Sequence, residues 1–113
     1  MEPLLPLSLA FVAAGALFAA LSVPLLRRRV KPNPWYGFRV PRTLDNDDRW
    51  YTVNAYAARF LLWGGIATAI AAPLLALLPG MGVDAYLLTM TAVVLAGPLL
   101  SLILGLRLLR TLP

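Results

Sequence analysis

The side chains best suited to recognising a ligand are concentrated in one polar segment, residues 27–59. Two tryptophans, three tyrosines and a phenylalanine stand there among arginines, prolines and aspartates. Tryptophan, tyrosine and arginine dominate binding surfaces, because each combines a large contact area with hydrogen-bond donors. We therefore predict that this segment is an ordered recognition element and not a solvated loop.

The rest of the inventory argues against bond-making chemistry. The chain has no cysteine and no histidine, which removes thiolate catalysis and the usual acid–base group near neutral pH. The carboxylates lie outside the apolar blocks: Glu2, Asp45, Asp47, Asp48 and Asp84. We therefore expect no catalytic residue, no cofactor and no metal. The protein is not expected to be an enzyme, although the sequence leaves a lipid-modifying activity at the membrane interface open.

The acidic triplet Asp45, Asp47 and Asp48 resembles a cation site only superficially. It lacks the alternating ligands and the glycine of a calcium loop. Negative charge is favourable in the first turn of a helix, so the triplet predicts a helix start, with Thr43 or Asp45 as its cap. Asp45 and Arg49 stand four residues apart and are expected to pair.

Trp50 and Asn54 share one face of this helix, which we expect to run on into the next apolar block. Asn54 is polar on an otherwise apolar face and should find a hydrogen-bond partner. The nearest candidate is the preceding stretch, which is expected to be extended. Three prolines bias the residues before them away from helix: Pro32, Pro34 and Pro41.

Gly37 stands between Tyr36 and Phe38. A glycine there predicts a positive φ or a close approach to another element. Arg39 follows, and an arginine beside aromatics can stack, or fork onto a carboxylate, a phosphate or helix-end carbonyls. The alternative for Trp35 and Tyr36 is an aromatic belt, with arginines meeting lipid phosphates.

Three apolar blocks must position this segment, and they run over residues 4–26, 60–78 and 85–106. With 60% hydrophobic and 13% charged residues, the chain lacks the polar surface of a soluble domain. Each block has about the 20 residues that a membrane-spanning helix needs. The sequence predicts one all-α membrane domain with three transmembrane helices and a structured loop between the first two. The first block is not expected to be a signal peptide, because the arginine cluster follows it.

The basic residues predict an orientation. The segment 27–59 holds eight of them, Arg107 and Arg110 close the third block, and the breaker-rich turn at 79–84 holds none. The positive-inside rule then places the loop and the C-terminus in the cytoplasm, and the N-terminus and the turn outside. The net charge of +5 is explained by these flanks, so no direct nucleic-acid partner is expected.

Small residues recur at helical spacing, which lets membrane helices approach closely. The third block has Gly97, Ser101 and Gly105, and the other two have Ala10, Ala14, Gly15, Ala19, Gly64, Ala67 and Ala71. We favour real packing for the third block. Because three helices bury little surface, a homo-oligomer is one use of these faces and packing within one chain is the other, and the sequence does not separate the two. Pro73 and Pro98 predict bends that could frame a cavity. No ionisable residue lies deep in a block, which weakens a transporter reading.

In residues 32–58 the sequence resembles the SdpI family of small bacterial membrane proteins. The shared signature is an Asn, an aromatic-Gly-x-Arg, a Pro-x-Thr, a Trp after a short acidic helix start, and an Asn four residues on. These positions are Asn33, Tyr36, Gly37, Arg39, Pro41, Thr43, Trp50 and Asn54. Val40 stands where a threonine is more usual. The resemblance implies that these residues either bind a partner or pin the loop to the second helix.

The resemblance also implies a three-span module in the cytoplasmic (inner) membrane of a bacterium. The family's namesake, a longer protein, protects producing cells from a secreted toxic peptide and is implicated in holding a repressor at the membrane. The first hypothesis is thus a non-enzymatic immunity protein against a membrane-active peptide toxin. The alternatives are a signalling scaffold that captures a cytoplasmic regulatory protein through loop 27–59, and a small oligomeric transporter or channel.

Overall fold

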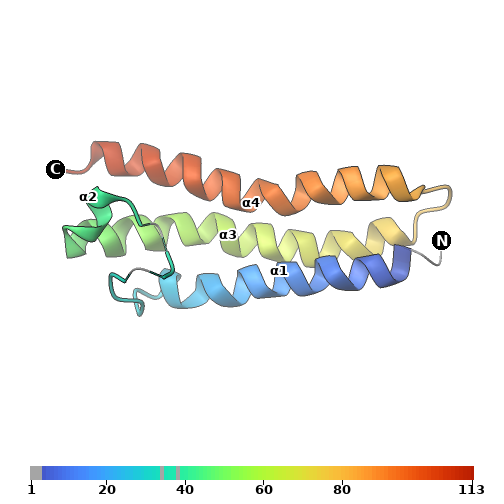
Figure 1. The fold of residues 1–113 in the computed structure, drawn as a ribbon, viewed down its shortest axis with the longest axis horizontal. Helices are drawn as coiled ribbons and strands as arrows, with labels where there is room; N and C mark the ends of the chain where they lie inside the picture. Colours follow the sequence, from blue (N-terminus) through green and yellow to red (C-terminus); the bar gives the residue numbers. More distant parts are fainter. Residues whose placement is uncertain (1–3, 34, 38) are drawn as a thin grey trace.

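Four helices make up the fold of the computed structural model (Figure 1), which describes residues 4–33, 35–37 and 39–113. They are α1 (Leu4–Leu26), α2 (Pro41–Leu44), α3 (Asp47–Ala76) and α4 (Val83–Thr111). No strand occurs in this described part, and α1, α3 and α4 are each long and apolar enough to cross a membrane. The predicted all-α membrane fold with three transmembrane helices is therefore confirmed. Glu2, Pro34 and Phe38 lie outside the described residues.

The polar helix and the second apolar block form one continuous helix, α3, as predicted. Its 30 residues span about 45 Å at 1.5 Å per residue, against about 30 Å for the hydrocarbon core of a bilayer. The predicted cap of this helix is wrong. The N-cap is Asn46, whose side-chain oxygen accepts the backbone N–H of Arg49 at 3.0 Å. Thr43 and Asp45 precede it, in and just after the separate helix α2.

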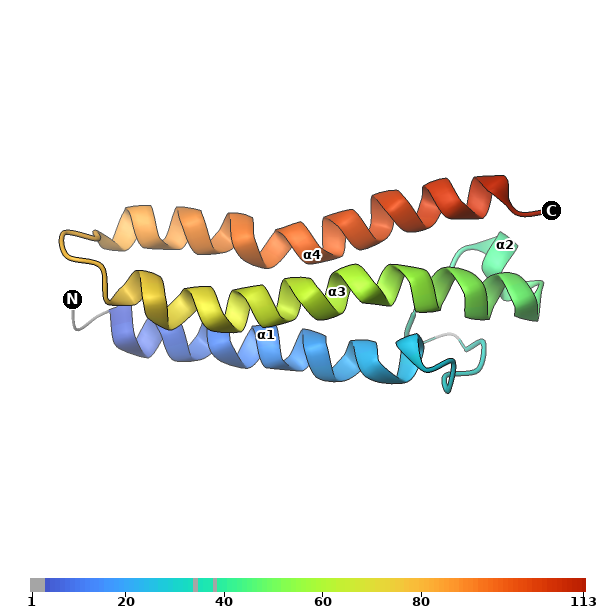
Figure 2. The ribbon, with the colours of Figure 1, turned by 180° about the vertical axis from the view of Figure 1, so that it is seen from behind.

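Helix α3 lies between α1 and α4, which touch each other at few points (Figures 1 and 2). Two glycine contacts set this arrangement. A Cβ on Gly15 of α1 would lie 2.4 Å from the carbonyl oxygen of Gly65, and a Cβ on Gly64 would lie 2.5 Å from the Cα of Gly97 in α4. Neither overlap could be tolerated, so close packing of the third block is confirmed at Gly97.

Several hydroxyls in the spans bond to backbone carbonyl oxygens of the protein, which suits lipid surroundings. Thr68 donates to the carbonyl oxygen of Gly64 at 2.8 Å, and Thr91 donates to that of Leu87 at 2.6 Å. Tyr86, fully buried near the start of α4, donates to the carbonyl oxygen of Ala72 at 2.9 Å. This last bond ties α4 to α3 at the end of the bundle that carries the 79–84 turn.

Candidate functional site

The connection between α1 and α3, residues 27–46, is here called the cap, and the end of the bundle that it covers is the cap end. The cap is fixed to α3 through Trp50, whose side chain is completely buried. The indole Nε1 donates to the carbonyl oxygen of Val30 at 2.7 Å. A buried indole N–H needs such a partner, so this bond pins the start of the cap against the first turns of α3.

Asn33 shapes the next part of the cap. Its Oδ1 accepts the backbone N–H groups of Trp35 at 2.9 Å and Tyr36 at 2.8 Å, and its Nδ2 donates to the carbonyl oxygen of Lys31 at 2.6 Å. An asparagine that bonds its own following backbone in this way makes a tight turn. The turn directs Tyr36 back toward α1.

The Tyr36 hydroxyl donates to the carbonyl oxygen of Leu21 in α1. Burial raises the pKa of Tyr36 above its ordinary value of 10.0, because a low-polarity setting disfavours the phenolate. The hydroxyl therefore stays protonated and remains a donor at physiological pH. This bond joins the cap to α1, as the Trp50 bond joins it to α3.

Gly37 fulfils both expectations drawn from the sequence. Its φ is +111°, and a Cβ there would lie 2.9 Å from Asn54 Oδ1 and 3.1 Å from the ring of Trp50. Asn54 is buried, and its Nδ2 donates to the carbonyl oxygen of Trp50 at 2.9 Å. The backbone of the cap thus touches the face of α3 that carries Trp50 and Asn54, where any other residue type would be too large.

Thr43 and Pro41 belong to α2, with Pro41 at its start. The buried Thr43 hydroxyl accepts the backbone N–H of Val40 at 3.1 Å and donates to the carbonyl oxygen of Val40 at 2.8 Å. Proline is favourable in a first helical turn, because a backbone N–H at that position would have no partner within the helix and its absence costs nothing. These two motif residues therefore turn the chain into α3.

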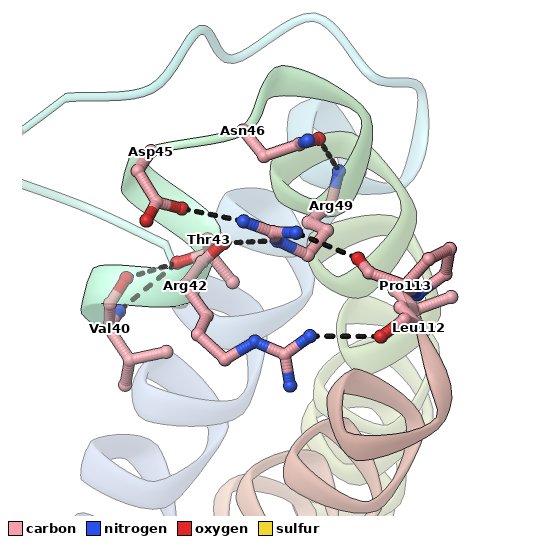
Figure 3. Close-up of polar contacts among 8 residues, drawn as sticks. All are labelled: Val40, Arg42, Thr43, Asp45, Asn46, Arg49, Leu112 and Pro113. Carbon is pink, nitrogen blue, oxygen red and sulfur yellow. Dashed lines mark hydrogen bonds and ion pairs between the residues drawn. The ribbon is translucent and has the colours of Figure 1, made fainter.

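Two further arginines attach the cap to the end of α4 (Figure 3). Arg49 donates to the carbonyl oxygens of Arg42 at 2.7 Å and Pro113 at 2.8 Å, and to the carboxylate of Asp45 at 2.8 Å. Arg42 donates to the carbonyl oxygen of Leu112 at 2.9 Å. The predicted Asp45–Arg49 pair is confirmed. The contacts with α4 were missed, because no local spacing signals a partner more than sixty residues away.

An apolar groove of about 390 Å³ lies beneath the cap. Its walls come from α1, the cap, α3 and α4: Leu21, Leu25, Tyr36, Gly37, Asn54, Ala57, Ala58, Leu61, Pro98, Ser101 and Leu102. None of these lining residues is charged. The sequence left open whether Pro98 only bends its helix or also lines a cavity. Pro98 lines the groove. Ser101, expected in helix packing, also lines the groove.

The structure thus brings five of the eight motif residues together, in the lining of the groove or in contact with it: Asn33, Tyr36, Gly37, Trp50 and Asn54. Arg39 is different, because it is exposed and lies outside the groove lining. Among the described residues, no cluster of carboxylates or other ligands could hold a metal ion. The arrangement is suited to binding an apolar segment.

The comparison with known families matches the segment that carries these motif residues. The family model described as the SdpI/YfhL protein family matches residues 29–108. No curated protein and no solved structure is significantly similar to the chain. The match runs from just after α1 to the last turns of α4 and covers well over half of the 113 residues. This multi-pass membrane protein therefore belongs to the SdpI/YfhL family.

Proposed function

We propose that this protein is a non-enzymatic immunity protein, which protects a bacterial cell from a membrane-active peptide toxin. Membership of the SdpI/YfhL family supports the class of function. The observation that carries the proposal is the uncharged groove between α1 and α4, which Tyr36, Gly37 and Asn54 line at the cap end. A peptide that inserts into membranes presents an apolar face, and such a face fits an uncharged groove.

The proposed binding mode follows from the walls of the groove. Ala57 and Ala58 form a flat floor on α3, and leucines from α1 and α4 stand on either side. Apolar side chains of the toxin would lie on this floor, sequestered from the bilayer.

The orientation that goes with this proposal places the cap and the C-terminus in the cytoplasm of a bacterial inner membrane. Its support is that every basic residue lies at the cap end, on the cap, the first turns of α3 or the last turns of α4. Topology reporters fused at residues 81 and 113 test it. A cytoplasmic signal from residue 81 would reverse the orientation.

Deleting the gene should make the cell more sensitive to the membrane-active peptides in its own culture supernatant. A groove-filling variant links that effect to the site. Ser101→Phe places a ring in the groove from α4, whereas Ala96→Phe places the same ring on an exposed position of α4 outside the lining. Complementation should fail with Ser101→Phe and succeed with Ala96→Phe at equal abundance. Equal protection by both variants would refute the groove as the binding site.

A second candidate function is a signalling scaffold that captures a cytoplasmic regulatory protein. One observation favours it: the side chain of Trp35 is 84% exposed on the cap, close in sequence to the exposed Arg39. Exposed tryptophan and arginine are typical anchors of protein interfaces. In a mild-detergent pull-down, a genuine regulator should be recovered with the wild type and lost with Trp35→Ala. Identical recovery with both proteins would count against the scaffold.

A further inference from the structure

A second hollow lies at the cap end, on the opposite face of α3 from the groove. It has a volume of about 380 Å³ and is lined by Leu26, Arg28, Thr52, Ala55, Tyr56, Arg59 and Leu108; we name it the arginine cleft. The two hollows use opposite sides of α3, because a helix has 3.6 residues per turn. The second hollow is lined from α3 by residues 52, 55, 56 and 59, and the groove by residues 54, 57, 58 and 61. The two hollows are therefore separate, and the motif residues do not line the arginine cleft.

The arginine cleft combines positive charge, hydroxyls and apolar surface. Two arginines line it, Arg28 and Arg59, and no lining residue carries a carboxylate. In the part of the chain that the structure describes, neither arginine forms an ion pair. The carboxylate of α3 that is nearest in sequence is that of Asp48, one turn from Thr52. Asp48 does not line the cleft but a neighbouring hollow, together with Arg49 and Thr52. The cleft therefore has positive charge that the protein itself does not neutralise.

Arg28 occupies a position that ordinarily belongs to glycine. Its backbone N–H donates to the carbonyl oxygen of Leu25 at 3.2 Å, and the backbone N–H of Arg29 donates to that of Pro24 at 2.9 Å. These two bonds close the end of α1. In this type of helix ending, the residue at Arg28 has a left-handed backbone and is usually glycine. Arg28 has φ +58° and is the sole described non-glycine residue with a positive φ. A left-handed backbone is unfavourable for a non-glycine residue, and strain of this kind points to a role for the side chain.

Arg59 is held from α3, with its guanidinium carbon 5.9 Å from the centre of the Tyr56 ring. Stacking on an aromatic face orients a guanidinium group without neutralising its charge. Leu26 is the last residue of α1, and Leu108 lies near the end of α4. The cleft is thus level with the ends of two spanning helices, where the phosphates of a bilayer leaflet lie.

We propose that the arginine cleft binds the headgroup phosphate of an anionic phospholipid. Arg28 and Arg59 hold the phosphate from α1 and α3, because guanidinium groups match phosphate oxygens in charge and geometry. The hydroxyls of Thr52 and Tyr56 are additional donors, and Leu26 and Leu108 border the acyl chains. A soluble phosphate would make no use of this apolar border. The site is independent of the groove and of the function proposed for it.

The test is titration of the purified protein in a neutral detergent with phosphatidylglycerol or phosphatidylcholine, with the first bound lipid quantified by native mass spectrometry. Arg28→Gly removes the guanidinium and relieves the backbone, so the variant should fold at least as well as the wild type. It should nevertheless bind phosphatidylglycerol about tenfold more weakly, as expected for one lost charge-assisted contact. Arg59→Gln should show a similar loss, and phosphatidylcholine binding should be weak in every variant.

Arg27→Gln is the matched control, because Arg27 is exposed beside Arg28 but does not line the cleft. It should lose less than about fivefold, the effect of one basic residue acting only through the surface potential. Equal losses for the Arg27 and Arg28 variants would overturn the proposal. Displacement of the lipid by millimolar inorganic phosphate would also overturn the lipid as the source, and would assign the cleft to a soluble phosphate.

Discussion

The contact between Gly37 and α3 yields the sharpest prediction about the cap. Replacing Gly37 by alanine forces a side chain into a backbone with φ +111°, with its Cβ 2.9 Å from Asn54 Oδ1 and 3.1 Å from the Trp50 ring. The left-handed backbone costs about 1–2 kcal/mol. Overpacking a well-filled site costs a further 1–3 kcal/mol or so. Asn54 is buried and bonded to Trp50, so it is a poor candidate to move aside.

The expected loss for Gly37→Ala is therefore about 2–5 kcal/mol, measured as SDS-induced unfolding in mixed micelles. Two other glycines separate the contributions. Gly80 has φ +77° and nothing within 4 Å of an added Cβ, so Gly80→Ala should show the backbone cost alone. Gly82 has φ −81° and equally open surroundings, so Gly82→Ala should be near neutral. If Gly37→Ala lost no more stability than Gly80→Ala, the close contact with α3 would be refuted.

The remaining predictions concern the bonds that hold the cap. Trp50→Phe removes the donor to the Val30 carbonyl and should cost about 1–3 kcal/mol in the same unfolding assay, whereas Trp63→Phe, at a 67% exposed position, should be near neutral. Because the pKa of Tyr36 is raised in the folded protein, its contribution to stability is complete below pH 10 and is lost as the pH rises through the folded-state pKa. Tyr36→Phe should reduce this loss of stability at alkaline pH. An unchanged loss would contradict the role of the Tyr36 hydroxyl as a buried donor. Arg49→Lys keeps the charge but loses the guanidinium group that donates to two backbone carbonyl oxygens. Hydrogen exchange at the last turn of α4 should therefore accelerate, while global stability changes by about 1 kcal/mol or less. Unchanged exchange would show that the arginine does not hold that end of α4.

Residue types and local spacing were enough to predict the fold class and much of the cap. Uncharged blocks of about twenty residues indicate spanning helices, because a bilayer offers no partner for an unpaired backbone group. The helical spacing of Trp50 and Asn54 predicted that α3 would be continuous, and a glycine between two aromatics predicted the tight approach at Gly37. These inferences succeed because each depends on neighbours along the chain or on the solvent.

The tertiary structure decided what depends on distant segments. Only the placement of α1 and α4 on either side of α3 creates a groove on one face and the arginine cleft on the other. The bonds of Arg42 and Arg49 to the residues that follow α4 join positions 70 and 64 residues apart, and the strained backbone of Arg28 arises where α1 ends. Asn46, and not Thr43 or Asp45, is the N-cap residue of α3 because of where α2 ends. Sequence spacing identifies side chains that share a face, but it does not say which other helix that face meets.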